Sequence, residues 1–155
     1  IENYARLCEL TWEYGLTADL EFMPWTAIKN IADARELVEA AAHPAAAILF
    51  DCLHFDRSDS TLDEISEIPR EMLNYVQICD GPADYDPSGE SMMALGRTAR
   101  LVPGEGGIDI AGIVERLPKD IPISVEVPNN ALAAEIGVET LVARALRASK
   151  AVLSH

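Results

Sequence analysis

Four apolar segments of this sequence each end in a side chain that can bind a metal ion. The four side chains are those of Glu21, Asp51, Gln77 and Glu126. An ionised side chain at the end of a buried strand is costly unless a partner neutralises it. A divalent cation is the simplest common partner for three carboxylates and an amide. Because all four offer oxygen ligands, we expect Mg²⁺, Mn²⁺ or Co²⁺ rather than Zn²⁺.

Hydrophobic patterns place these residues on strands that alternate with helices. Helical spacing or capping signals occur at 2–14, 30–42, 61–67, 90–98, 110–117 and 137–153, and strand patterns at 18–22, 46–51, 75–79 and 121–127. The continuous apolar run 46–51 is typical of a parallel strand covered on both faces. Strands that alternate with helices predict a parallel sheet with right-handed crossovers. We therefore predict an α/β fold in which residues 1–155 form a single domain, half of a (β/α)8 TIM barrel.

In such a barrel the active site lies at the carboxyl ends of the strands, and alternate side chains point inward. The four polar residues can thus converge near the barrel axis. A doubly wound open sheet is the competing fold, but no Gly-x-Gly-x-x-Gly follows a strand. A half barrel leaves unpaired edges near Leu20 and Val125. The sequence starts at Ile1 rather than Met, so we expect a fragment whose missing amino-terminal half, or a second copy, closes the barrel.

The charge balance argues against two classes of partner. The chain has 12 basic and 26 acidic residues, a net charge of −14, which disfavours binding to nucleic acid or to anionic membranes. No apolar run reaches the ~18 residues of a membrane span. The cysteines, Cys8, Cys52 and Cys79, are odd in number and lack Cys-x-x-Cys spacing. Reduced thiols in a cytoplasmic protein are therefore expected.

Four short motifs carry a resemblance to a known family. In order along the chain they are Glu21-Phe22-Met23-Pro24-Trp25, Asp51-x-x-His54-Phe55-x-Arg57-Ser58, Val76-Gln77-x-x-Asp80 and Pro103-Gly104-Glu105-Gly106. Together, over nearly the whole chain, they resemble the carboxyl-terminal half of the xylose-isomerase-like TIM barrels, roughly the last four βα units. That group includes sugar phosphate isomerases and epimerases, inosose and 3-dehydroshikimate dehydratases and, more distantly, endonuclease IV.

The resemblance implies a metal site and a set of substrate contacts. The family's metal ligands fall on Glu21, Asp51, Gln77 and Glu126. The epimerase branch normally has His at the third position, whereas a 3-dehydroshikimate dehydratase branch looks similar in using Gln. His54 matches a position that contacts substrate near the metal.

Trp25 and Arg57 are further candidate substrate contacts, with alternatives. Trp25 is equally suited to packing in the barrel wall. Arg57 and Arg100 can hold a phosphate or carboxylate, or can pair with the abundant local acid.

The expected reaction is a divalent-metal-dependent isomerisation or epimerisation of a sugar or sugar phosphate through an enediolate, in carbohydrate metabolism. Glu21 and Glu126 would act as acid and base, and His54 would polarise a carbonyl or shuttle a proton. The same enolate, with a β-hydroxyl leaving group, gives a dehydration. Two alternatives therefore stay open: a dehydratase of the inosose or 3-dehydroshikimate type, and a barrel that binds a small polyhydroxylated molecule without turnover.

Overall fold

The computed structural model describes residues 1–154 of the chain. Strands alternate with helices along the sequence, as predicted. The elements in chain order are α1 (Glu2–Trp12), β1 (Ala18–Glu21), α2 (Ile31–Ala41), β2 (Ala46–Asp51), α3 (Cys52–Asp56), α4 (Leu62–Ser66), the 3₁₀ turn η1 (Arg70–Met72), β3 (Leu73–Ile78), α5 (Gly89–Thr98), α6 (Ile110–Arg116), β4 (Ile123–Val125), α7 (Asn130–Ile136) and α8 (Val138–Val152). Among the helices of residues 1–154, none is both long enough and apolar enough to cross a membrane.

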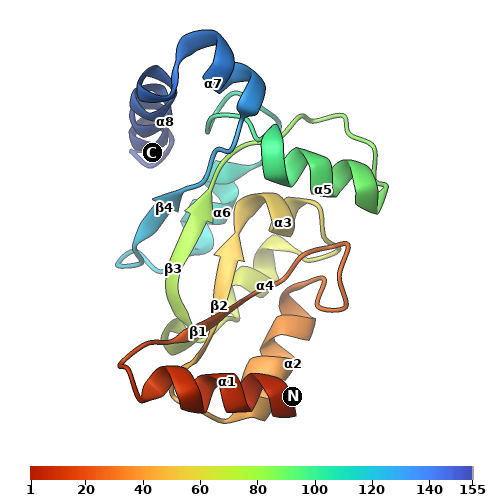
Figure 1. The fold of residues 1–155 in the computed structure, drawn as a ribbon, viewed down its shortest axis with the longest axis vertical. Helices are drawn as coiled ribbons and strands as arrows, with labels where there is room; N and C mark the ends of the chain where they lie inside the picture. Colours follow the sequence, from red (N-terminus) through yellow and green to blue (C-terminus); the bar gives the residue numbers. More distant parts are fainter. Residues whose placement is uncertain (155) are drawn as a thin grey trace.

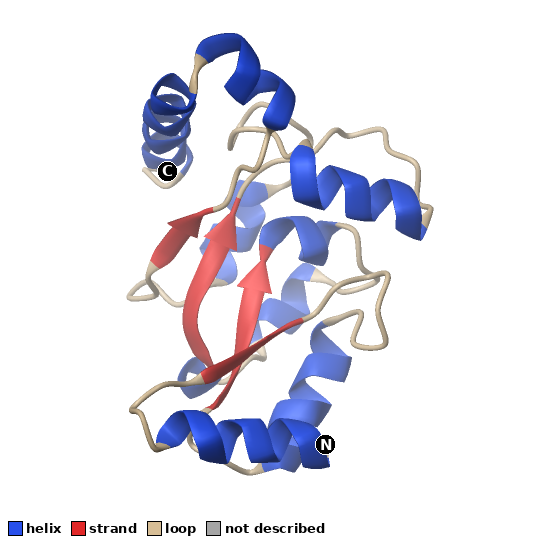
Figure 2. Cartoon of the chain, in the orientation of Figure 1, coloured by secondary structure: helices blue, strands red, loops and turns tan. Residues whose placement is uncertain are grey.

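The strands form one parallel sheet in the order β1-β2-β3-β4. Helices α2, α4 and α6 lie behind this sheet in Figure 2, while its other face is turned toward the viewer. At the edges, α1 lies near β1 and α8 near β4 (Figure 1). Helices outside and one open sheet face are the arrangement of a partial TIM barrel. The predicted fold class is thus confirmed, with β1 and β4 at the sheet edges as expected.

The helix-covered face of the sheet is apolar because alternate strand residues point toward the helices. Phe22, Ile48, Phe50, Val76 and Ile78 are almost completely buried there. The rings of Phe22 and Phe50 meet edge to face with their centroids 6.0 Å apart, a favoured geometry for aromatic pairs. Since a slip of one residue would turn these side chains to the open face, this layer fixes the register of the strands.

The open face of the sheet is polar. Asp19 and Glu21 on β1 and Gln77 on β3 are half-buried, and Asn74 is exposed. The Asn74 amide donates hydrogen bonds to Asp19 Oδ1 at 2.7 Å and to Thr17 Oγ1 at 3.1 Å. A polar open face is expected where a sheet lines the interior of a barrel that holds a polar site.

The last strand is shorter than predicted. The sequence pattern predicts a strand over 121–127, but β4 spans only Ile123–Val125. Pro122 and Pro128 flank it, and proline cannot donate a backbone hydrogen bond to a neighbouring strand. Pairing with β3 nevertheless continues one residue further, because the Glu126 N–H donates to the Ile78 carbonyl at 3.0 Å. This bond holds Glu126 at the end of the sheet.

Candidate metal centre

Asp51 ends β2 and begins the next helix. Its Oδ1 atom accepts hydrogen bonds from the backbone N–H groups of Leu53 at 2.9 Å and of His54 at 3.1 Å. The side chain therefore caps α3, a short helix that the sequence patterns do not predict. This cap places His54 one turn beyond Asp51, and both side chains are buried.

Three predicted site residues come together at the carboxyl ends of β1 and β2. One ligand-type atom from each of Glu21, Asp51 and His54 lies within 4.8 Å of the other two. The Glu21 Oε1 atom is 3.4 Å from His54 Nε2. Ligands about 2.1 Å from a small divalent cation lie no more than about 4.2 Å apart, so small side-chain adjustments would let these atoms share one ion.

Gln77 and Glu126 extend the cluster along the strand ends. Gln77 pairs in register with Asp51 on one side and with Ser124 on the other. Its Oε1 atom is buried and has no hydrogen-bond partner within residues 1–154, which costs about 1–3 kcal/mol if nothing binds it. A buried amide oxygen without a partner, beside carboxylates, fits a ligand of a hard divalent cation.

Burial and mutual repulsion shift the pKa values of the clustered groups. Burial, reinforced by the charges of Asp51 and Glu126, raises the pKa of Glu21 to about 7. Burial also raises the pKa of Glu126. Burial lowers the pKa of His54 to about 4, so its imidazole is neutral at pH 7. The cluster thus concentrates negative charge that a bound cation would stabilise.

Arg100 also belongs to the cluster, although it is not one of the four ligands predicted from the sequence. Its Nη1 atom lies 2.5 Å from Asp51 Oδ2 and 2.9 Å from Glu126 Oε2, and its side chain is 4% exposed. The guanidinium reaches this position from just beyond α5. An ion pair with local acidic residues is one of the two roles predicted for Arg100, and Asp51 and Glu126 are its partners.

Trp25 lies beside His54. The two rings meet edge to face, with centroids 5.0 Å apart and planes at 80°. Helix α5 packs closely on this pair, because a Cβ atom at Gly96 would lie 3.4 Å from the indole of Trp25 and 3.8 Å from His54 Cε1. Figure 1 shows α5 beyond the carboxyl end of β2, next to α3. The predicted contact residue Trp25 thus borders the cluster and also packs in its wall.

Arg57 is held away from the cluster. Its guanidinium forms an ion pair with Asp56, donates to the Pro82 carbonyl at 2.7 Å and lies 3.7 Å above the ring centroid of Tyr85. These contacts fasten the loop after β3 to α3. The structure therefore favours the ion-pair alternative for this residue, and the substrate-binding role remains a prediction without a supporting contact.

Asp80, in the third motif, binds the backbone of two loops next to the site. Its Oδ1 accepts from the N–H groups of Gly81 and Ile108, and its Oδ2 from those of Gly104 and Gly106, all at 2.8–3.0 Å. One buried carboxylate thereby anchors the Pro-Gly-Glu-Gly loop to the end of β3. Its role is to position backbone, so the motif residue is structural.

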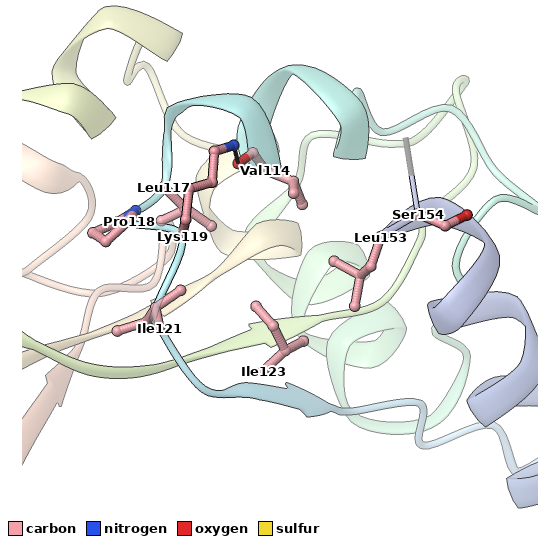
Figure 3. A pocket seen from close by; sticks show the side chains of 8 residues that line it. All are labelled: Val114, Leu117, Pro118, Lys119, Ile121, Ile123, Leu153 and Ser154. Carbon is pink, nitrogen blue, oxygen red and sulfur yellow. Dashed lines mark hydrogen bonds between the residues drawn. The ribbon is translucent and has the colours of Figure 1, made fainter.

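A cavity of about 360 Å³ lies elsewhere in the molecule (Figure 3). It is bounded by α6, the start of β4 and the end of α8, with apolar side chains forming most of its wall. The Lys119 ammonium at its rim donates to the carbonyl oxygens of Val114 and Glu115. Among residues 1–154, no carboxylate lines this cavity, so these residues offer none of the chemistry found at the strand ends.

The parallel half barrel and the carboxylate cluster at its strand ends indicate the class of protein: this chain is part of a TIM barrel with a candidate metal centre. Residues 1–150 match the family described as xylose isomerase-like TIM barrel, and the chain belongs to that family. The expected family is thus confirmed.

Relatives in the curated proteins carry a dehydratase name. The chain is 25% identical over 138 residues to a 3-dehydroshikimate dehydratase of Pseudomonas putida and 26% identical over 137 residues to one of Pseudomonas aeruginosa. Each match covers 86% of this chain but only 21% of the relative. The chain therefore spans about a fifth of the length of these curated relatives.

A solved structure gives the same picture of the fold. The chain is similar to the IOLI protein, whose crystal structure was described with a bound zinc atom, with a TM-score of 0.83 and 20% identity. The match covers 97% of this chain and 53% of that one. The strands and helices described above thus correspond to about half of a complete barrel.

Proposed function

We propose that the barrel to which this chain contributes catalyses the divalent-metal-dependent dehydration of a cyclic hydroxy-ketone. Two of its curated relatives are named 3-dehydroshikimate dehydratase, which supports the dehydration. The observation that carries the proposal is the set at the strand ends: Glu21, Asp51 and His54 form one cluster, and beside them lies the Gln77 oxygen, which has no hydrogen-bond partner among residues 1–154. This choice replaces the isomerase or epimerase as the first candidate, since the dehydratase names favour the alternative.

The ligand set would be Glu21, Asp51, Gln77 and Glu126. A divalent cation bound there would supply a Lewis acid that polarises the carbonyl group of a hydroxy-ketone. The oxygen donors favour Mg²⁺, Mn²⁺ or Co²⁺, and the zinc in the IOLI crystal structure makes Zn²⁺ a necessary comparison.

Glu21 and His54 are the groups placed to move protons. In the dehydration, a C–H bond next to the carbonyl breaks, the β C–O bond breaks, a C=C bond forms and water leaves. The step needs a base for the carbon-bound proton and an acid for the departing hydroxyl. Neutral His54, with Nε2 3.4 Å from Glu21 Oε1, is suited to exchange a proton with Glu21. Trp25 holds the imidazole ring from one side.

An isomerase or epimerase is the second candidate, and one feature of the sheet favours it. Glu21 ends β1 and Glu126 follows β4, and these are the two edge strands of the sheet. Two carboxyl groups that approach from opposite sides are what epimerisation needs, because the proton leaves one face of the carbon and returns to the other.

A substrate screen with mass detection separates the candidates. The metal-loaded protein is incubated with 3-dehydroshikimate, inososes, ketoses and sugar phosphates. Dehydration lowers the mass of the product by one water, whereas isomers and epimers keep the mass and change only chromatographic mobility. The Asp51→Asn variant is the matched control.

Loss of water from a cyclic hydroxy-ketone, absent in the control, is the expected result. Turnover without a mass change would support the second candidate. Tight metal binding without turnover of any of these compounds would overturn both and indicate a binding protein.

A further inference from the structure

One nitrogen atom of Arg100 contacts carboxylates from two separate strands. Nη1 reaches Asp51 at the end of β2 and Glu126 just after β4. Between these strands runs β3, on which Gln77 pairs in register with Asp51. The guanidinium therefore lies where the oxygens of the candidate ligand set converge.

Asp51 can offer a cation only one of its two oxygens. Oδ1 accepts two backbone N–H groups, at 2.9 and 3.1 Å, and these occupy both of its lone pairs. Oδ2 remains, and it is the atom that Arg100 holds at 2.5 Å. A metal ion that uses Asp51 must bind the same oxygen as the arginine.

The rest of the guanidinium is fixed by contacts outside the carboxylates. Nε donates to the Gly96 carbonyl at 2.8 Å, Nη1 is 3.5 Å from Cys79 Sγ, and Nη2 is 3.5 Å from His54 Nε2. A buried arginine held in this way is a built part of the site rather than a surface side chain folded inward.

Within residues 1–154, no hydrogen bond or ion pair joins Arg100 to either of the remaining ligands. Glu21 contacts His54, and the Gln77 oxygen has no partner among residues 1–154. The cluster thus has two halves. Asp51 and Glu126 contact the positively charged guanidinium of Arg100, whereas Glu21 and Gln77 do not.

Resting on the proposed metal centre, we propose that Arg100 is the resident cation of the metal-free site and that a divalent metal competes with its guanidinium for Asp51 and Glu126. Without metal, Arg100 keeps the buried carboxylate of Asp51 and the partly exposed carboxylate of Glu126 from repelling each other. With metal, those carboxylates turn to the ion. The affinity for metal is therefore lower than the four ligands alone would give.

The test measures metal affinity and metal-free stability in Arg100→Met. Methionine has a similar length and no charge. Arg97→Met is the matched control, because Arg97 is exposed at the end of α5, three residues before Arg100, and its loss changes the net charge equally. Mn²⁺ binding is followed by calorimetry, and thermal unfolding is measured after dialysis against a chelator.

The proposal expects Arg100→Met to bind Mn²⁺ at least about tenfold more tightly, since a like charge close to the ion is gone, and to unfold at a lower temperature without metal. Arg97→Met should match the natural protein in both. Unchanged or weaker Mn²⁺ binding in Arg100→Met would overturn the competition.

Two further measurements keep the test decisive. Should Arg100→Met fail to fold without metal, Arg100→Lys keeps the charge but cannot reach Gly96 and both carboxylates at once. We expect Arg100→Lys to bind Mn²⁺ more tightly than the natural protein does, but less tightly than Arg100→Met that has been refolded with Mn²⁺. Weaker Mn²⁺ binding by Arg100→Lys than by the natural protein would contradict the proposal. If neither the natural protein nor any variant binds Mn²⁺, Mg²⁺, Co²⁺ or Zn²⁺, the proposed metal centre is wrong. If the natural protein binds metal but Arg100→Met does not bind it more tightly, only the proposed competition is wrong.

Discussion

The indole of Trp25 meets the imidazole of His54 edge to face, with the ring centroids 5.0 Å apart. His54 in turn lies 3.4 Å from Glu21. Trp25 therefore borders the candidate metal centre. The other tryptophan, Trp12, lies on α1 and packs edge to face on His43, with centroids 6.1 Å apart. The two tryptophans thus report on different parts of the molecule.

Fluorescence of Trp25 should respond to metal. In a Trp12→Phe variant, we expect addition of Mn²⁺ to quench the remaining emission with a saturable dependence, because a paramagnetic ion would bind near the indole. The matched Trp25→Phe variant should show no saturable change. A response of equal size from both variants would mean that the ion does not bind at the strand ends.

Replacing Glu21 with Gln should stabilise the metal-free protein at high pH and remove metal binding. The pKa of Glu21 rises from 4.5 to about 7 on folding, so the folded state binds this proton more tightly. Its contribution to stability is present below the unfolded pKa and is lost as the pH rises through 7. At about pH 8 the variant should unfold about 2–4 °C above the natural protein, which corresponds to about 1 kcal/mol.

The pH profile gives this prediction its control. The metal-free natural protein should lose more stability between about pH 5 and pH 8 than the Glu21→Gln variant does. Glu36 is exposed on α2, and Glu36→Gln should leave the profile unchanged. Equal slopes for the natural protein and Glu21→Gln would contradict the account of this carboxylate.

Gln77 offers a pair of variants that separates ligation from packing. Gln77→Leu removes a buried oxygen that has no partner among the described residues, so metal-free stability should stay equal or rise. Its metal affinity should fall by roughly tenfold or more. Gln77→His supplies a nitrogen ligand and should keep metal binding. Calorimetric titration with Mn²⁺ checks both variants. Unchanged affinity in Gln77→Leu would show that β3 does not contribute a ligand, and loss of binding in Gln77→His would show that the site is not built in this way.

Asp80 should be needed for stability rather than for metal binding. Asp80→Ala removes the acceptor of four backbone N–H groups, that of Gly81 and three in the 104–108 loop. We expect a loss of about 3 kcal/mol or more in the free energy of unfolding, measured with urea. Asp120, exposed and paired with Arg70, is the control, and its replacement by Ala should change little. A mild effect at Asp80 would mean that the loop is held by other contacts.

Strand positions could be predicted from the sequence because parallel strands have a strong local signature. The predicted strand 46–51 coincides with β2, whose residues are all buried. β3 begins two residues earlier than predicted, at Leu73. The pairing of β2 with β3 shifts register between Ile48 and Phe50, a tertiary irregularity that a periodic pattern cannot reveal. Helix α3 has only five residues and its cap is Asp51 itself, so it too has no periodic signal.

The part of the site that lies at the strand ends could be predicted from the sequence. Glu21, Asp51 and His54 come together because β1 and β2 are neighbours and His54 follows the Asp51 cap. Arg100 enters through a different cause: α5 packs with Gly96 against Trp25 and His54, and this contact brings the residues after α5 over the strand ends. No spacing in the sequence encodes that approach. The metal-binding roles of the four predicted ligands remain predictions.

The content of bound metal tests the central claim most directly. The purified protein is dialysed in turn against Mg²⁺, Mn²⁺, Co²⁺ and Zn²⁺, and metal is measured by elemental analysis beside the Asp51→Asn and Glu126→Gln variants. We expect about one ion per chain with at least one of these metals, and a loss of that ion in both variants. No bound metal in the natural protein, or the same amount in the natural protein and the variants, would contradict it.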